Sequence, residues 1–207
     1  MTSLKPLKIA VFASGSGSNF QALAEAIRAG GINATIELVV CDKPSAYVLE
    51  RAAQLGIESY LFRPKEYASR EAYEAQIVAK LQEMGIDLII LAGYMRIVTN
   101  TLLEPYYGRM INIHPALLPA FPGLDGIGQA IAYGARITGV TVHFVDGGMD
   151  TGPIIAQRAV EVLEGDTAET LGTRIHQAEH QLLPDVVKWI AEGRVTLNGR
   201  KVTVRQG

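Results

Sequence analysis

Three residues of different chemical type are spaced so that they could form one polar site. Asn112 and His114 lie two apart at the end of the apolar run 110–113, so on an extended strand both side chains point to the same face. Asp150 lies in a later glycine-rich turn, 146–153. An amide, an imidazole and a carboxylate can together donate hydrogen bonds and move a proton. A buried structural histidine beside a turn-forming asparagine would give the same sequence pattern, so the choice between a functional site and a structural pair depends on the rest of the chain.

Composition limits the classes of protein to consider. The 207 residues are 48% hydrophobic and 19% charged, which is typical of a globular protein of one large or two small domains. A net charge of -2 gives no bulk attraction to nucleic acid or to an anionic membrane. No stretch reaches the roughly 18 apolar residues of a membrane span, and the run 9–13 is too short for a signal peptide. Cys41 is the only cysteine, and we expect a buried thiol in a cytoplasmic protein.

Short apolar runs alternate with amphipathic segments in the first half of the chain. This alternation predicts strands separated by helices, as in a Rossmann-like, doubly wound and mostly parallel sheet. The predicted strands are 8–13, 36–41, 59–62, 87–92 and 110–113, and the predicted helices are 19–29, 46–55 and 70–84. Ser69 is the expected N-cap of the third helix, and Glu74 is expected on its surface.

The second half has a different pattern. Two longer, partly alternating runs, 138–145 and 154–162, predict an antiparallel pair that extends the sheet. A long helix is expected over 168–191, followed by a hairpin over 195–204. Three prolines crowd the segment after the polar strand, and we predict a cis peptide bond between Leu118 and Pro119. The chain shows no linker or internal repeat, so one domain is expected.

The loop 14–19 carries a second chemical signal. It reads SGSGSN, follows a strand and opens a helix, where backbone N–H groups and the helix dipole bind phosphate. Phe20 stands where a dinucleotide fingerprint needs its third glycine, and no Walker sequence is present. A single phosphate therefore fits better than a pyrophosphate. The alternative is a simple turn in which Ser18 or Asn19 serves only as the N-cap.

Taken together, six segments resemble the folate-dependent formyltransferase family, and within it the phosphoribosylglycinamide formyltransferases. The segments are 14–19, 91–96, 112–119, 121–123, 139–145 and 149–153. The resemblance implies one formyltransferase domain over 1–207, with a phosphate-binding half over about 7–110 and a catalytic, folate-binding half over about 111–207. It implies 10-formyltetrahydrofolate as co-substrate, glycinamide ribonucleotide as acceptor and no metal, in a monomer or homodimer that binds neither nucleic acid nor membrane.

The resemblance also assigns roles to residues. The catalytic residues would be Asn112, His114 and Asp150. The substrate's phosphate would be held by Gly17, Ser18 and Asn19, with Glu179 at the ribose or glycinamide end, unless Glu179 is only a solvated helix carboxylate. The folate would meet Arg70 at its glutamate tail, and its pterin would be lined by Met95, Arg96, Ile97, Val98, Asn112, Asp146, Gly147, Gly148, Met149 and Asp150.

These residue types suit formyl transfer. The reaction passes through a tetrahedral carbon that bears an oxyanion, while one proton leaves the amine and one reaches the folate nitrogen. Asn112 would donate to the oxyanion, a kind of contact whose removal costs roughly 100- to 1000-fold in rate. His114 would donate to the same oxygen or relay protons, and Asp150 would hold the imidazole and favour its charged form. Gly147 and Gly148 would let this turn adopt positive φ angles.

Some features leave alternatives open. Many relatives carry a histidine soon after 121–123, and the stretch 124–127 has none. The other histidines, His143, His176 and His180, are expected to be structural or on the surface. A formyltetrahydrofolate hydrolase or a methionyl-tRNA formyltransferase would use the same trio, but we expect neither the extra N-terminal nor the extra C-terminal domain that they carry. A non-catalytic sugar-nucleotide binding module is the alternative from another class.

Overall fold

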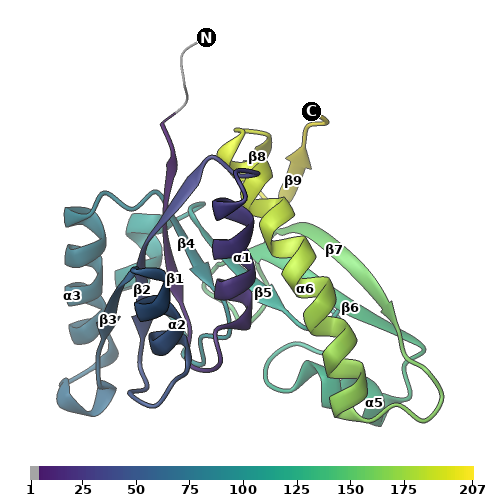
Figure 1. The fold of residues 1–207 in the computed structure, drawn as a ribbon. Coiled ribbons are helices and arrows are strands. Elements are labelled where there is room, and N and C mark those ends of the chain that lie inside the picture. The colour runs from purple at the N-terminus through teal and green to yellow at the C-terminus, as the bar shows by residue number, and fades with distance from the viewer. Residues whose placement is uncertain (1–4) are drawn as a thin grey trace. The chain divides into compact units, whose positions relative to one another are not determined.

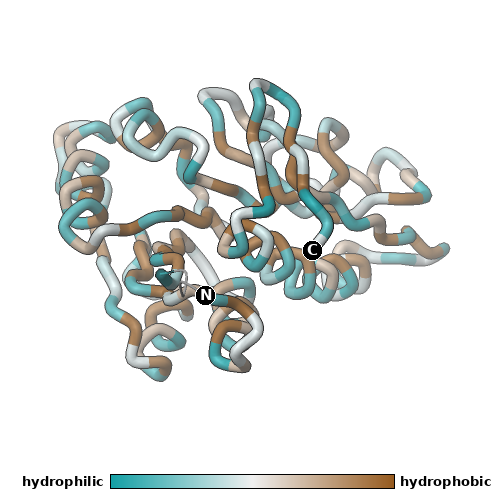
Figure 2. Tube along the Cα trace, turned by 90° about the horizontal axis from the view of Figure 1, so that it is seen from above, coloured by the Kyte–Doolittle hydropathy of each residue, from teal (hydrophilic) through white to brown (hydrophobic). Residues whose placement is uncertain are grey.

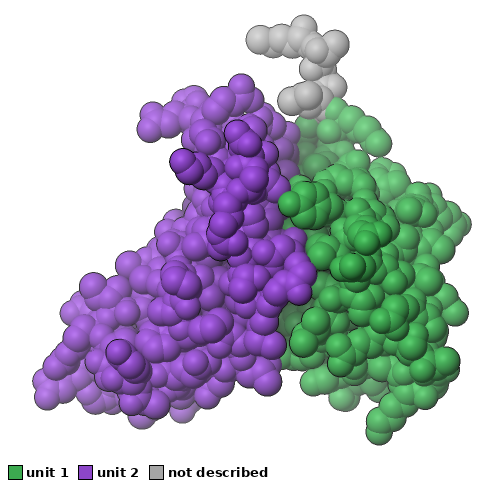
Figure 3. Space-filling model, turned by 180° about the vertical axis from the view of Figure 1, so that it is seen from behind, with its two compact units in different colours: residues 1–111 green, residues 112–207 purple. Residues whose placement is uncertain are grey.

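The computed structural model describes residues 5–207. Its main sheet has seven strands in the order β3-β2-β1-β4-β5-β6-β7, and β8 and β9 form a separate two-stranded sheet. The chain divides into two compact units, residues 1–111 and 112–207, coloured separately in Figure 3. Within residues 5–207, no helix is both long enough and apolar enough to cross a membrane.

The first unit is a doubly wound α/β layer. Its elements are β1 (Leu7–Phe12), α1 (Ser18–Arg28), β2 (Ala34–Cys41), α2 (Val48–Leu55), β3 (Glu58–Leu61), η1 (Pro64–Glu66), α3 (Arg70–Glu83), β4 (Leu88–Leu91), α4 (Asn100–Leu103) and η2 (Glu104–Tyr106). β1 pairs in parallel with β2 and β4, and β2 with β3. The chain first moves outward from β1 to β3 and then returns to the other side of β1. Since such crossovers are right-handed, α1 and α2 cover one face and α3 the other.

The core of this unit consists of apolar strand residues. All four residues of β4 are buried, as are the last four of β1 and of β2, including Cys41. Such continuous burial is expected of parallel strands that helices cover on both faces. The helices in Figure 2 alternate between hydrophobic and hydrophilic residues, as amphipathic helices do. The carboxyl ends of the adjacent strands β1 and β4, where the chain reverses direction, are the usual place for ligands in such sheets.

The second unit combines an antiparallel pair of strands with a long helix. β5 (Met110–His114) spans the division, and α5 (Gly126–Tyr133), β6 (Ile137–Phe144), β7 (Ile154–Glu161), α6 (Ala168–Ala191), β8 (Val195–Asn198) and β9 (Lys201–Val204) follow. β6 and β7 pair antiparallel from Ile137 opposite Glu161 onward. α6 lies along β6 and β7 (Figure 1) and begins with a capping box between Thr167 and Thr170.

Most of the predicted elements are confirmed, with ends that move by one or two residues. The Leu118–Pro119 bond is cis, and Ser69 accepts a hydrogen bond from the N–H of Ala72 at 3.2 Å. The four short helices η1, α4, η2 and α5 were not predicted. The expectation for Glu74 was wrong: its side chain is buried and accepts a hydrogen bond from the N–H of Thr99 at 2.9 Å. The carboxylate therefore accepts the hydrogen bond of a backbone N–H just before α4 instead of facing solvent.

Candidate active site

The second unit brings Asn112, His114 and Asp150 together. Asn112 and His114 lie on β5, and the side-chain nitrogen Nδ2 of Asn112 is 3.4 Å from Oδ1 of Asp150. Nδ1 of His114 is 3.5 Å from Oδ2 of the same carboxylate. That oxygen also accepts a hydrogen bond from the N–H of Gly123 at 2.7 Å. An amide, an imidazole and a carboxylate thus meet in one cluster, although 36 to 38 positions separate the turn from the strand along the sequence.

The partners of His114 decide which of its nitrogens can take part in chemistry. Nε2 is 2.8 Å from the carbonyl oxygen of Phe121, and a carbonyl can only accept, so Nε2 carries a hydrogen. Nδ1 therefore faces Asp150, and it carries a hydrogen only when the ring is an imidazolium. A proton on Nδ1 completes an ion pair with the carboxylate, so the cluster can hold His114 as a donor.

His143 is the member of this cluster that sequence reasoning missed. It lies on β6, is 2% exposed, and its Nδ1 is 2.8 Å from the carbonyl oxygen of Phe144. Its Nε2 is consequently an acceptor, 3.1 Å from Nδ2 of Asn112, and it is 3.7 Å from Oδ1 of Asp150. A signal was present, because Thr141 and His143 are polar residues two apart in an apolar run. His176 is exposed on α6, and His180 is half-buried.

These contacts orient the Asn112 amide. One N–H of Nδ2 points to Nε2 of His143, which leaves the other for Asp150 at 3.4 Å. The second distance is long for a hydrogen bond, so this N–H is only weakly engaged and can donate to another acceptor placed in the same direction. Asn112 therefore keeps one donor available for a substrate atom.

Asp150 is held as a carboxylate. Burial raises its pKa, but the interactions with the His143 and His114 rings and the hydrogen bond from the Gly123 N–H together outweigh burial and lower the pKa below its usual value. Its backbone φ is 55°, a left-handed conformation that is uncommon outside glycine. The positive φ angles expected at Gly147 and Gly148 are not seen, and the left-handed residue of this turn is Asp150 itself.

The rest of the glycine-rich turn is arranged around Asp146. Its Oδ1 accepts hydrogen bonds from the N–H of Gly148 at 3.1 Å and from the hydroxyl of Thr151 at 2.7 Å. A Cβ on Gly148 would overlap this Thr151 hydroxyl, so the close turn needs glycine there. Met149 is 56% exposed, which leaves an apolar side chain beside Asp150 for a ligand.

The loop predicted to bind phosphate lies in the first unit at the start of α1. Gly17 is the N-cap with φ 72°, and no side chain of the described residues caps this helix. The N–H groups of its first turn, from Ser18 and Asn19 onward, are the usual anion donors of a helix start. Two hydrogen bonds from α2 hold the loop in place. Val48 N–H donates to the Gly15 carbonyl at 3.1 Å, and Arg51 Nε donates to the Ser16 carbonyl at 2.9 Å.

The segment predicted for the pterin, 95–98, follows β4. Met95 and Ile97 are 60% and 57% exposed and offer apolar contact. The N–H of Met95 donates to the hydroxyl of Ser14 at 3.0 Å, and Nε of Arg96 donates to Asp42 at 2.7 Å. Met95 N–H and the Arg96 side chain are therefore already engaged, and the contacts left to this segment are its exposed apolar side chains and its remaining backbone groups.

The two remaining residues that were predicted to contact a substrate, Arg70 and Glu179, differ in solvent exposure. Arg70 is exposed at the first residue of α3, where its guanidinium is accessible to a carboxylate. Glu179 is buried on α6, so the alternative of a solvated helix carboxylate was wrong.

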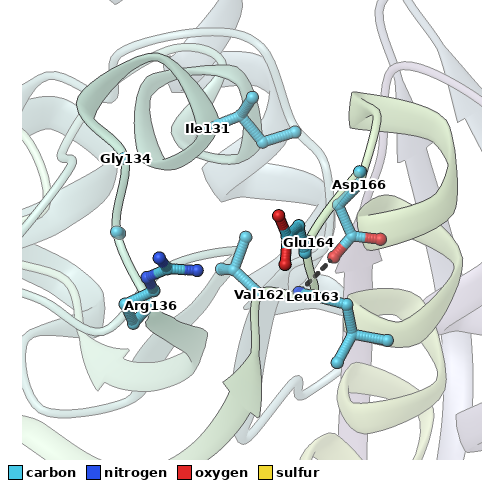
Figure 4. Close-up of a pocket in the computed structure, with 9 residues that line it drawn as sticks. Ile131, Gly134, Arg136, Val162, Leu163, Glu164 and Asp166 are labelled. Carbon is cyan, nitrogen blue, oxygen red and sulfur yellow. Dashed lines mark hydrogen bonds between the residues drawn. The ribbon is translucent and has the colours of Figure 1, made fainter.

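A depression in the second unit lies apart from these residues. It has a volume of about 320 Å³ and lies between the end of α5, the start of β6 and the connection from β7 to α6 (Figure 4). Arg136, Glu164 and Asp166 line it, and Asp166 accepts a hydrogen bond from Leu163 N–H at 2.7 Å. None of the predicted site residues contributes to its described lining.

Comparison with known proteins gives one consistent family. The formyl transferase family matches residues 7–187. A phosphoribosylglycinamide formyltransferase of Bacillus subtilis strain 168 is 52% identical over 87% of this chain and 93% of that protein. The trifunctional purine biosynthetic protein adenosine-3 of Drosophila melanogaster is 44% identical over 96% of this chain but only 15% of that longer protein. The crystal structure of glycinamide ribonucleotide transformylase 1 from Symbiobacterium toebii has 45% identity and a TM-score of 0.96, over 99% of this chain and 96% of that one. The chain therefore belongs to the formyl transferase family.

Proposed function

We propose that this enzyme transfers the formyl group of 10-formyltetrahydrofolate to the glycinamide amine of 5'-phosphoribosylglycinamide, a step of purine biosynthesis. The observation that carries the proposal is the cluster of buried His114 with half-buried Asn112 and Asp150, in which Asp150 is held as a carboxylate. The loop at Gly17, Ser18 and Asn19 supplies the site for the single phosphate of the acceptor. The named relatives support this choice of acceptor within the family.

The amine nitrogen forms a bond to the formyl carbon while the carbonyl electrons move onto oxygen. Asn112 donates its weakly engaged N–H to that oxyanion, and His114 donates the Nδ1 hydrogen, which Asp150 holds only loosely at 3.5 Å. Asp150 stabilises the protonated imidazole, and His143 holds the Asn112 amide in the orientation that presents its N–H. The Asp150–His114 pair takes one proton from the amine and returns one to the folate nitrogen, and the bond between the formyl carbon and that nitrogen breaks.

The folate contacts follow from the exposed apolar residues. In the first unit, exposed Met95 and Ile97 offer apolar contact to an aromatic ring system, and Arg70 pairs with the glutamate carboxylates; in the second unit, exposed Met149 offers apolar contact of the same kind. Glu179 serves the glycinamide or ribose end of the acceptor. The lone buried thiol, Cys41, fits the reducing cytoplasm, where we propose that the enzyme acts.

The test is formyl transfer with purified protein. Tetrahydrofolate formation is followed with glycinamide ribonucleotide as acceptor, and formate and formyl-ribonucleotide are quantified separately. Stoichiometric formyl-ribonucleotide supports the proposal. Formate release without an amine acceptor would show a hydrolase, and formylation of methionyl-tRNA would show the other transferase. Ligand binding without either product would show a non-catalytic binding module.

A further inference from the structure

A buried carboxylate outside the proposed catalytic trio links two ligand-binding segments of the first unit. Asp42 follows β2, and its side chain is 1% exposed. Its Oδ1 accepts a hydrogen bond from the hydroxyl of Ser14 at 2.6 Å, and its Oδ2 accepts one from Nε of Arg96 at 2.7 Å. Ser14 begins the phosphate-binding loop, and Arg96 belongs to the pterin segment.

The contacts form a closed ring. The N–H of Met95 donates to Ser14 Oγ at 3.0 Å, so the single hydroxyl hydrogen of Ser14 is directed to Asp42. Arg96 follows Met95 in the chain and returns to the other oxygen of the same carboxylate. The N–H of Ser14 also donates to the Gly93 carbonyl at 3.0 Å. The loops after β1 and β4 are therefore joined at the strand ends where the chain reverses direction.

The charge on Asp42 matters for this ring. Hydrogen bonds to an ionised acceptor are shorter and roughly twice as strong as neutral ones. A carboxylate offers acceptors on both oxygens, whereas a neutral amide offers an acceptor on one side and N–H groups on the other. An amide at position 42 would either set its N–H groups against the Arg96 guanidinium or force the Ser14 hydroxyl to give up its role as donor, and in both cases the ring would lose its negative charge and one of its present contacts.

We propose that Asp42 is a positioning residue that holds the phosphate-binding loop and the pterin segment in register for the two substrates. The inference rests on the proposed function, because it takes the ribonucleotide and the folate as the ligands of these two segments. Asp42 touches neither ligand in this account and acts through Ser14, Met95 and Arg96.

The main test is Asp42→Asn, which keeps the size of the side chain. A misplacement of about 1 Å at a substrate-binding segment can cost about 100-fold in rate. We expect kcat/KM to fall by about 10- to 100-fold, with the KM of both substrates raised. A purely structural role would lower the fraction of folded enzyme, and hence the apparent kcat, and leave both KM values unchanged.

A matched control is available in the second unit. Asp166 is another nearly buried carboxylate paired with an arginine, Arg174, and its other bonds run to Leu163 and Thr170. Asp166→Asn should lower thermal stability and leave both KM values within twofold of wild type. Ser14→Ala and Arg96→Gln each open one half of the ring, and either change combined with Asp42→Asn should cost less than the product of the two single effects, because the changes act on the same ring.

Binding is also measured without turnover, by calorimetry with ribose 5-phosphate and with tetrahydrofolate. Loss of affinity for both probes in Asp42→Asn, with the folded fraction checked by circular dichroism, supports the inference. Unchanged affinity for both, or for either one, overturns it. Wild-type enzyme that binds both probes but transfers no formyl group would refute the proposed function alone. Normal transfer by wild type with unchanged KM values in Asp42→Asn would refute the inference alone.

Discussion

Gly17 provides a direct test of the phosphate-binding loop. A Cβ built on Gly17 would lie 2.5 Å from Cγ2, 2.7 Å from Cβ and 3.0 Å from Cα of Val48, and the φ of Gly17 is 72°. For an alanine, the left-handed backbone costs about 1 to 2 kcal/mol. Overpacking against Val48 adds about 1 to 3 kcal/mol. Gly17→Ala should therefore either lower the free energy of unfolding by about 2 to 5 kcal/mol or push the loop away from α2.

Gly15→Ala is the matched control in the same loop. Gly15 is exposed, its φ is not positive, and a Cβ there would meet no heavy atom of the described chain within 4 Å. Its effect on the free energy of unfolding should stay below about 1 kcal/mol. Val48→Ala would remove only the nearest of the three clashing atoms, so it should rescue Gly17→Ala only in part.

The assay combines urea unfolding with steady-state kinetics. If the loop moves, the first-turn N–H groups leave the phosphate, and the KM for the ribonucleotide should rise by more than about tenfold, which is 1.4 kcal/mol. The KM for the folate should stay within twofold of wild type. Gly17→Val should act in the same direction and more strongly. Equal rises for both substrates would show general damage to the fold, and a Gly17→Ala enzyme as stable and active as Gly15→Ala would refute the argument.

Three further predictions concern the cluster in the second unit. Asp150→Asn and His114→Ala should each lower kcat strongly with little loss of folate binding. The double variant should be little worse than the poorer single one, since residues that act as a unit are non-additive. Fully multiplicative losses in kcat/KM across pH 5 to 9 would show independent roles. Asn112→Ala should lower the rate by roughly 100- to 1000-fold by the same factor at every pH, because a neutral amide does not titrate, and a pH-dependent loss would contradict this. The folded-state pKa of Asp150 is lowered, so its carboxylate adds stability above its unfolded pKa of about 3.9, and this stability is lost as the pH falls through the folded value. Urea unfolding from pH 7 to pH 2 should therefore show a smaller loss of stability for Asp150→Asn than for wild type. If the free energy of unfolding of both proteins falls in parallel with pH, the prediction is wrong.

Local patterns in the sequence were enough for the strands, the long helices and part of the site. Apolar runs such as 36–41 predict buried strands because burial on both faces excludes polar residues. Asn112 and His114 stood out because two polar residues on one face of such a run need partners. The glycines of the loop 14–19 and its place before a helix predicted the anion site. In each case the signal is the spacing of apolar and polar residues, or the backbone conformation that a glycine allows, within a few neighbouring residues of the chain.

Only the tertiary structure determined the contacts between residues that are far apart in the sequence. Ser14 meets Asp42 across 28 positions, Arg96 meets Asp42 across 54, and Met95 meets Ser14 across 81. Glu74 and His143 looked like a surface carboxylate and a structural histidine until Thr99 and Asn112 were seen beside them. The left-handed backbone in the turn lies at Asp150 instead of the glycines, where its carboxylate is held by Gly123. No local pattern encodes such pairs, because burial becomes favourable for a polar group only when a distant segment arrives to satisfy it.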